Sequence, residues 1–486
     1  MGYQESSAGK GGVQAGAVTS LEKLAAWSLE PHPQLRSGDA LRQASLLVLD
    51  SIGCALAALD NSDARAVMEL AEETGGNASC TIIGTETRSS LLNAVLVNGV
   101  LVRVLDFNDI MFIRSAGHMI VGGHRSDNIP VALAVGEKLG SPGIAILESI
   151  VLGYEIFGRL KALTHYGSPF DSSSLSGITA AAMAGRLMQF GPGRQANALA
   201  IAASRCLTPF IVRKGHVSGM KSFANAMVAQ SAVLAAQLAE KDIGGPLQIL
   251  DHETFGLQHF FDPKQGFERL WAPLGDHLDI FDTHIKSYPC IGTAQTLVRA
   301  AIDAHAHLAG GFQDISRIRI TMAEAPFIVD QQVDHTRRVP LSREAADHSF
   351  TFLSVAALMD GELTPRQFEN ERWREPRTRA LMEKVELEVS DALGERARDS
   401  VPCRIAVALV TGEEIAAECL YPPGHSAAGR LDPATVTKKF RTLAIPVLGM
   451  DSAEEVIHRV LGLAAQSTVS GVMNLLRPQT TGHYNN

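Results

Sequence analysis

The chain has 486 residues, of which 46% are hydrophobic and 20% charged, and its formal net charge is −9. This composition is typical of a globular protein with a large core, and the length predicts two or three domains. A negative chain without a Lys/Arg run excludes nucleic acid as an expected partner, although converging cations can still bind a small anion.

The six cysteines are isolated from one another, so the sequence predicts neither a zinc site nor an iron–sulfur cluster, and it fits a reducing compartment. Residues 1–16 are rich in Gly, Ser and Gln and are predicted to be disordered. The longest apolar stretch, Ala94–Leu105, is interrupted by Asn98 and Arg103 and is too short to span a bilayer. We therefore expect a cytoplasmic protein without a membrane segment.

Residues 17–270 have the apolar periodicity of helices. It is clear in Leu41–Leu59, Ile144–Leu163 and Gly177–Met188. The segment Ala224–Leu238 is nearly all apolar and small, which predicts a helix buried on most sides.

The pattern changes after about residue 270. Strand-like alternation occurs in Ile315–Met322, Val385–Val389 and Arg404–Val410, and Thr411-Gly412-Glu413 reads as a hairpin turn into Glu414–Leu420. Helical segments, Thr293–His307 and Ser349–Met359, separate the strands, and helical periodicity returns in Thr435–Leu443 and Ala453–Ala465. We predict an α+β unit over 271–420 between helical segments at 17–270 and 421–486.

One stretch concentrates groups suited to proton transfer. Asp106, Asp109, His124 and Ser126 lie between two apolar runs, so burial of their side chains without partners would be costly. A histidine that titrates near neutrality beside carboxylates is typical of acid–base chemistry. The alternative is a polar loop between helices, and His118 competes with His124 as the working imidazole. Asp106 and Asp109 would share a face if the segment were helical.

The second stretch is Arg213–Lys221, which contains three cations and His216 directly before the buried small-residue helix. A lysine at that position is unfavourable unless an anion meets it. The pattern indicates a carboxylate or phosphate cradle around Lys221, or else a lysine whose amine reaches the surface.

The third stretch lies where helical sequence gives way to mixed structure, a common place for clefts, and the fourth opens the helix predicted at Ser349–Met359. Lys286–Thr296 contains Tyr288, Cys290 and Gln295; Cys290 is favoured as a small buried side chain over a nucleophile. In Asp347-His348-Ser349, Asp347 is either a helix cap or a site residue.

The order and spacing of these stretches resemble the MmgE/PrpD family, from about Ser20 to Ala465. The markers of the resemblance are LDSIGCALA (49–57), LDFND (105–109), GHRSDNIPVALAVGE (123–137), GMKSFANA (219–226), KSYPC (286–290), AADHSFTFLSVAALMDGELTPRQF (345–368), YPPGH (421–425) and KKF (438–440).

The resemblance implies a mainly α fold: a large helical domain formed by both chain ends, with a smaller α+β lid inserted. It also implies a homodimer, no metal or organic cofactor, and a site between the domains. On the family's site motif, Asp106, His124 and Lys221 are the expected catalytic residues. The expected substrate-binding residues are Asp109, Ser126, Arg213, Lys286, Tyr288, Gln295 and His348.

There are departures from the family pattern. The decarboxylase branch has a histidine near Ser172 and another at Gln295, whereas Ala294-Gln295-Thr296 and Asp347-His348-Ser349 look closer to the dehydratase branch. The insert that holds His118 is longer than usual, and His165 is the candidate to substitute spatially for the histidine missing at 172.

We therefore expect a cofactor-independent lyase that hydrates or dehydrates a small polycarboxylate, as 2-methylcitrate dehydratase does. The alternatives are a cis-aconitate-type decarboxylase, an iminodisuccinate-type epimerase and a non-catalytic carboxylate-binding homologue. In this hypothesis His124 is the acid–base group, Asp106 orients it, and Lys221 binds or protonates the substrate. Lys286 and Arg213 would bind distal carboxylates. Lys221→Met is expected to abolish turnover without changing the melting temperature.

Overall fold

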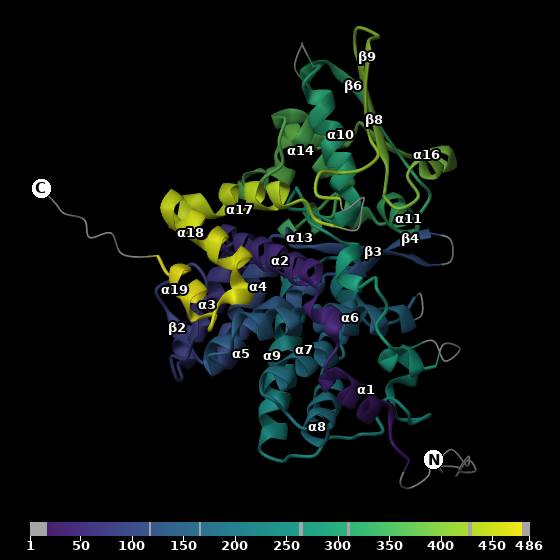
Figure 1. Cartoon of the computed structure of the whole chain (residues 1–486). Helices are drawn as coiled ribbons and strands as arrows, with labels where there is room; N and C mark the ends of the chain where they lie inside the picture. Colours follow the sequence, from purple (N-terminus) through teal and green to yellow (C-terminus); the bar gives the residue numbers. More distant parts are fainter. Residues whose placement is uncertain are drawn as a thin grey trace, which may run out of the picture.

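The computed structural model describes residues 17–115, 118–164, 167–261, 266–308, 312–425 and 430–478. The predicted disordered segment 1–16 lies outside these ranges. The described part is mainly helical, as the sequence predicts, and forms two lobes, each with its own hydrophobic core (Figure 1).

The lower lobe, which we call the body, is built from both ends of the chain. In Figure 1 the purple helix α2 (Gly38–Ala57) runs beside the yellow helix α17 (Pro433–Leu448), and Gly53 allows close contact with Phe440. One hydrophobic cluster joins residues 21–285 to residues 431–476. The other body helices are α1 (Ser20–Leu29), α3 (Ser62–Thr74), α4 (Leu91–Arg103), α5 (Ile129–Leu139), α6 (Gly143–Leu163), α7 (Leu175–Leu187), α8 (Pro192–Ala203), α9 (Met220–Glu240), α18 (Met450–Leu461) and α19 (Ser470–Leu475).

The upper lobe, which we call the lid, has a four-stranded sheet in the order β7-β6-β8-β9. The strands are β6 (Ile315–Met322), β7 (Val385–Val389), β8 (Cys403–Leu409) and β9 (Glu414–Cys419). The predicted hairpin β8–β9 is confirmed. The sequence did not reveal that β7 pairs with β6 in parallel, with Ile320 opposite Leu387.

Helices α10 (Gln295–His305) and α14 (Phe350–Asp360) pack together in the lid, and the lid core runs from Cys290 to Cys419. The shorter lid helices are α11 (Pro326–Val333), α12 (His335–Arg338), α13 (Arg343–Ala346), α15 (Pro376–Met382) and α16 (Asp391–Arg396). The sequence prediction assigned 271–290 to the lid, but Leu274, Leu278 and Ile285 pack in the body core. The division into domains stays a prediction.

A small sheet in the order β4-β3-β5 lies in the body beside the passage into the lid. Its strands are β3 (Ile110–Ser115), β4 (His118–Gly123) and β5 (Thr283–His284), and Ile110 pairs with His284. The sequence predicted no strands over residues 110–123: the segment forms the β3–β4 hairpin, which also pairs with a strand far along the chain. This pairing brings the segment after α4 next to Lys286. A two-stranded pair, β1 (Cys80–Thr81) and β2 (Arg88–Ser89), completes the described strands.

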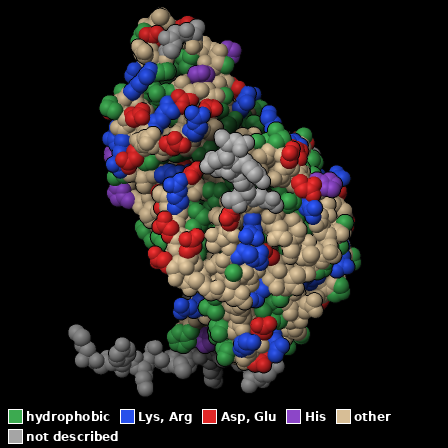
Figure 2. All heavy atoms as spheres, turned by 90° about the vertical axis from the view of Figure 1, so that its left-hand side faces the viewer, with side chains coloured by type: hydrophobic (Ala, Val, Ile, Leu, Met, Phe, Trp, Pro, Cys, Tyr) green, Lys and Arg blue, Asp and Glu red, His purple; other side chains and the backbone are tan. Residues whose placement is uncertain are grey.

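One described helix, α2, is long and apolar enough to cross a membrane, and 83% of its apolar window is buried inside the body. On the face shown in Figure 2, the surface is hollowed where the two lobes meet. Acidic and basic side chains are interspersed over both lobes on that face.

Candidate functional site

Asp106 is the centre of a buried polar cluster at the junction of body and lid. Helix α4 ends at Arg103, and the turn that follows gives Asp106 a φ of 51°, in the left-handed region that non-glycine residues rarely adopt. Such a conformation costs of order 1 kcal/mol and is common at functional sites. The carboxylate is 1% exposed and accepts hydrogen bonds from Arg103 and Lys286, with the Lys221 amine at 3.4 Å. These cations hold its pKa well below the usual value against the effect of burial.

Lys221 lies in the first turn of α9 and is 1% exposed. A cation at a helix N-terminus is opposed by the helix dipole and, when buried, needs a counter-ion. Asp347 of the lid supplies it: the Lys221 amine donates to both carboxylate oxygens at 2.8 Å. The alternative role of Asp347 as the cap of α14 is wrong, because Ser349 caps that helix.

Lys286 enters the cluster from the chain segment that joins body and lid. Its amine is fully buried and donates to the carbonyl oxygen of Asp106 at 2.9 Å and to its carboxylate. Burial lowers the pKa of Lys286, and Asp106 opposes that shift. The amines of Lys221 and Lys286 therefore approach one carboxylate from different elements.

Two imidazoles border the cluster, and both are neutral at neutral pH. Burial, followed by the charge of Lys221, lowers the pKa of His348 to about 3, and its Nδ1 contacts the Asp347 carboxylate. Burial, followed by the charges of Arg103 and Lys286, lowers the pKa of His124 well below its usual value. The His124 Nδ1 lies 2.6 Å from the carbonyl oxygen of Asp109. Because a carbonyl only accepts, Nδ1 carries the proton, and Nε2 is left with a free lone pair.

The prediction that Asp106 orients His124 is wrong, and the condition under which Asp106 and Asp109 would share a face is not met. The segment 104–109 is not helical, and the two carboxylates do not share a face: Asp109 accepts from Ser126 Oγ at 2.5 Å and from Tyr154 at 2.8 Å. In the described hydrogen bonds, His124 is oriented by the carbonyl of Asp109 and not by the carboxylate of Asp106. Ser126 and Asp109 thus support the loop that contains His124.

Arg213 and Gln295 also hold backbone beside the site. Arg213 pairs with Asp171 at 3.0 Å and donates to the carbonyl of Lys221 at 3.0 Å. Gln295 Oε1 accepts from the backbone N–H groups of Ser287 and Tyr288, and its Nε2 donates to the Tyr288 carbonyl. Both side chains therefore position the loops of the two lysines.

Tyr288 faces the lid. Burial raises its pKa to about 12, and the nearby charge of Arg299 opposes that rise. Ser172 lies beside Gly123, since a Cβ on that glycine would sit 3.5 Å from Ser172 Oγ. The serine is therefore next to the start of the His124 loop. The side chain of His118 and residue His165 lie outside the described part of the chain.

Three residues near the site were missed as candidates in the sequence. The sequence prediction treated Arg103 only as an interruption of an apolar segment. A charged residue inside an apolar segment was the available signal that Arg103 is a buried site residue. Asp127 lies 3.7 Å from Arg103 Nε, and burial raises its pKa to about 7. Lys439 of α17 pairs with Asp50 at 2.7 Å and donates to the Phe107 carbonyl at 2.7 Å, so it fixes the turn that contains Asp106.

The charges of the cluster do not balance. Three buried cations, Arg103, Lys221 and Lys286, face the carboxylates Asp106, Asp127 and Asp347. Arg343 adds a further positive charge 3.5 Å from Asp347. The arrangement is thus suited to binding an anion between two neutral bases.

Among the described residues, Asp106, Asp347 and His348 could offer ligand atoms to a metal ion, since those atoms lie within 4.8 Å of one another. The donor set fits a cation poorly, because Lys221 and Lys286 already donate to the same carboxylates. The absence of a metal requirement stays a prediction.

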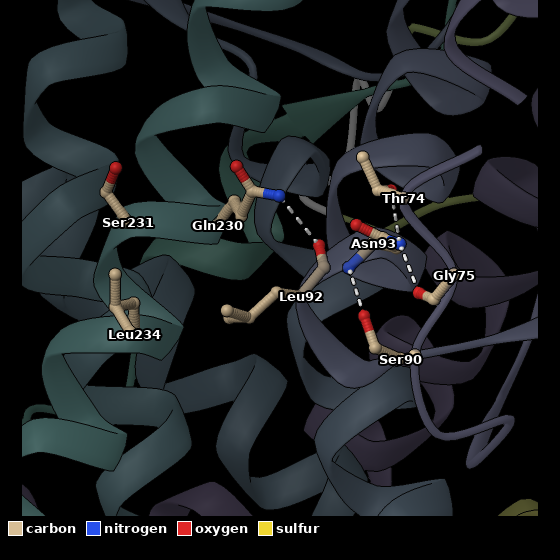
Figure 3. A pocket seen from close by; sticks show the side chains of 9 residues that line it. Thr74, Gly75, Ser90, Leu92, Asn93, Gln230, Ser231 and Leu234 are labelled. Atoms are coloured by element: carbon tan, nitrogen blue, oxygen red, sulfur yellow. Dashed lines mark hydrogen bonds between the residues drawn. The ribbon is translucent and has the colours of Figure 1, made fainter. Parts of the chain in front are cut away.

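A surface hollow of about 410 Å³ lies elsewhere, between α9 and the segments around Gly75 and Ser90 (Figure 3). Two of its polar side chains are hydrogen-bonded within the hollow: Asn93 donates to the Thr74 hydroxyl and the Gly75 carbonyl, and Gln230 donates to the Leu92 carbonyl. The hollow does not contain the cluster around Asp106.

Comparison with known proteins matches two family models to the chain. The MmgE/PrpD N-terminal domain matches residues 22–269, and the MmgE/PrpD C-terminal domain matches residues 288–463. The cis-aconitate decarboxylase of Homo sapiens is 25% identical over 464 residues, which cover 90% of each chain. The 2-methylcitrate dehydratase of Cupriavidus necator is 25% identical over 434 residues, covering 84% of this chain and 87% of the relative. The probable 2-methylcitrate dehydratase of Saccharomyces cerevisiae is 26% identical over 374 residues, covering 72% and 70%.

Proposed function

The chain belongs to the MmgE/PrpD family, and from this premise we propose that it is a lyase that hydrates or dehydrates a small polycarboxylate. The relatives are named both as dehydratases and as decarboxylases at similar identity, so their names support a lyase without selecting the reaction. The dehydratase proposal comes from the residues of the site.

The observation that carries the proposal is a cation-rich buried centre flanked by two neutral imidazoles. When Arg343 is included, the cations of the cluster outnumber by one the carboxylates that they face, which favours an anionic ligand. His124 and His348 are unprotonated at neutral pH and are able to act as bases. Small polycarboxylates combine negative charge with weakly acidic C–H groups next to a carboxylate.

In the proposed dehydration, one imidazole removes the proton from the carbon next to a carboxylate. The electron pair of that C–H bond forms the C=C bond, and the hydroxyl on the neighbouring carbon leaves as water with a proton donated by the Lys221 ammonium. Lys221 and Lys286 stabilise the negative charge that develops on the carboxylate. We assign the base role to His124, because its Nδ1 hydrogen bond leaves Nε2 as acceptor, with His348 as the second acid–base group.

Gln295 favours dehydration over decarboxylation in this proposal, whereas the histidine missing at Ser172 weakens the carry-over of either activity and keeps the non-catalytic alternative open. By the family resemblance, the decarboxylase branch has a histidine at or near each of these two positions. Ser172 lies beside Gly123, and the Gln295 amide is engaged with the backbone of the Lys286 loop. Neither position supplies a proton donor of the imidazole type.

The test is proton NMR of the purified protein in D₂O with 2-methylcitrate, citrate, cis-aconitate and succinate-type acids. Formation of an alkene from a hydroxy acid, or the reverse hydration, is the expected result. Release of CO₂ would select the decarboxylase alternative, and deuterium exchange without net conversion would select the epimerase. Tight binding without turnover of any acid would identify a non-catalytic homologue.

We further propose that the reaction needs no metal or organic cofactor and takes place in the cytoplasm. Dialysis against a chelator is expected to leave turnover unchanged. Loss of turnover that Mg²⁺, Mn²⁺, Fe²⁺ or Zn²⁺ restores would contradict the cofactor-free proposal.

A homodimer is also proposed, and the outer face of α9 supports it. Met220, Met227 and Leu234 lie seven residues apart on that face and are 46%, 46% and 43% exposed. No charged residue occurs between Ser222 and Ala239, which is unusual for an exposed helix face and typical of an interface between copies.

Analytical ultracentrifugation tests this proposal. Met227→Glu with Leu234→Glu is expected to give a monomer, while Val410→Glu, at an exposed site on the lid, leaves the dimer intact. A wild-type monomer at micromolar concentration would contradict it.

A further inference from the structure

Arg337 differs from the other buried cations of the described residues. Arg103, Arg125, Lys221, Lys286 and Arg337 have side chains in the buried class. Each of the first four has a carboxylate oxygen within ion-pair distance. Asp106 is the partner of Arg103 and Lys286, Asp279 is the partner of Arg125, and Asp347 is the partner of Lys221. Arg337 is 6% exposed, and in the described part of the chain no carboxylate forms an ion pair with it.

Only one of the two terminal nitrogens of the Arg337 guanidinium has a hydrogen-bond partner among the described residues. Its Nη2 donates to the carbonyl oxygen of Arg213 at 2.7 Å, whereas Nη1 is buried and has no hydrogen-bond partner among the described residues. Burial lowers the pKa of this arginine. Leaving a buried charge uncompensated costs several kcal/mol, so a missing anion is the natural complement of the group.

The acidic groups that influence Arg337 are already engaged. Asp334 accepts from Thr336 at the start of α12, Asp330 pairs with Lys214 at 2.6 Å, and Asp347 holds Lys221. A counter-ion from within this set would have to break one of those contacts. An anion from outside the chain would not.

Arg337 is coupled to the candidate site through the loop that precedes α9. The Arg213 carbonyl accepts from Arg337, and the Arg213 guanidinium donates to the Lys221 carbonyl at 3.0 Å. Two lid side chains donate hydrogen bonds to the same loop. The Thr336 hydroxyl donates to the Gly215 carbonyl at 2.9 Å, and the Ser342 hydroxyl donates to the Val217 carbonyl at 2.7 Å. The unpaired guanidinium therefore lies on the lid side of the loop that positions Lys221.

We propose that Arg337 binds a carboxylate group of the substrate that is remote from the reacting carbons, and thereby selects tricarboxylates over dicarboxylates. The inference rests on the proposed function and adds a recognition residue to the same site. Lys221 and Lys286 hold the carboxylate at the reacting end, and Arg337 accepts the far end with a charge-assisted hydrogen bond from Nη1.

The experiment measures the binding of two probes, tricarballylate and succinate, to the full-length protein by calorimetry. Arg337→Gln keeps a donor for the Arg213 carbonyl and removes the charge. We expect this variant to bind tricarballylate about 10–100-fold more weakly, the usual effect of losing a charge-assisted hydrogen bond, and to bind succinate as the wild type does. Arg337→Lys is expected to recover part of the affinity.

Arg338→Gln is the matched control, because Arg338 is the next residue and its side chain is exposed. It is expected to bind both probes as the wild type does. Equal loss of both probes in Arg337→Gln, or no loss of either, would overturn the assignment of Arg337. A wild-type protein that binds neither probe would instead overturn the proposed function itself, and the inference with it.

Once a substrate is known, kinetics provide a readout that a purely structural role would not give. Arg337→Gln is expected to raise KM for a tricarboxylate while kcat stays within about twofold, since the affected group is remote from the reacting carbons. A fall in kcat with unchanged KM would contradict a binding role.

Discussion

Replacing Lys221 by methionine tests both the chemistry and the electrostatics of the site. From the sequence alone this variant is expected to be inactive but as stable as the wild type. The structure reverses the second expectation, because Lys221 is the principal partner of the buried carboxylate of Asp347, with its amine 2.8 Å from both oxygens. Methionine leaves that carboxylate with His348, which is neutral, and with Arg343 at 3.5 Å.

The magnitude follows from these distances. At an effective dielectric constant of about 20, unit charges separated by about 3 Å attract by roughly 5–6 kcal/mol. Removing one partner of a buried pair destabilises proteins by about 3–5 kcal/mol, since the other charge remains desolvated. We expect Lys221→Met to lower the free energy of unfolding by about that amount and to abolish turnover.

Urea denaturation followed by circular dichroism and tryptophan fluorescence measures the stability. The double variant Lys221→Met/Asp347→Asn removes both charges and is expected to recover most of the lost stability while remaining inactive. A single variant as stable as the wild type, or a double variant no better than the single one, would refute the reasoning. Retained turnover in Lys221→Met would remove the lysine from the chemistry.

Other predictions concern the surroundings of the site. Lys439→Met frees the backbone of the turn after α4 and is expected to lower kcat more than it changes KM, whereas Lys438→Met, at an exposed site, changes neither. His348 has a pKa of about 3 in the folded protein and near 6.5 in the unfolded chain, so between these pH values the unfolded chain binds one more proton than the folded protein. On acidification through this range the free energy of unfolding falls by up to about 1.4 kcal/mol per pH unit. The variant His348→Gln is expected to reduce that slope in urea titrations. Asp127 changes stability with pH in the opposite direction. Its pKa of about 7 in the folded protein exceeds the value in the unfolded chain, so its contribution to stability is lost as the pH rises through 7. The variant Asp127→Asn is expected to remove this loss. Equal pH profiles for the wild type and either variant would contradict these assignments.

The elements that the sequence predicts well are those whose burial pattern is local. Strands β6 and β7 have the predicted bounds, because alternation reports directly on a sheet with one exposed face. Strands β3 and β4 form a local hairpin that the sequence prediction missed, and the pairing of β3 with β5 leaves no local pattern because β5 lies so far along the chain. The parallel pairing of β7 with β6 is hidden for the same reason.

The site was predictable as a set of residue types but not as a set of pairs. Asp106, Lys221 and Lys286 stand out in the sequence because charged groups occur beside apolar segments, where burial is costly. Nothing in the sequence shows that the counter-ion of Lys221 is Asp347, 126 residues away. Nor does it separate Arg337 from Arg338: one is buried and the other exposed because of the turn of a short helix.

The pairing of Lys221 and Lys286 bears on how the site can bind a substrate. In the described structure both amines already donate to carboxylates, and Asp106 is held in a left-handed backbone conformation that keeps its oxygens among three cations. A substrate carboxylate that enters replaces one oxygen partner of an amine by another of the same kind. The protein therefore needs little reorganisation of charge on binding, which is the condition under which fixed cations stabilise a developing carbanion most effectively. In the proposed function, the cation in excess over Asp106, Asp127 and Asp347 then remains to hold the added negative charge, which would favour a polycarboxylate over a single carboxylate.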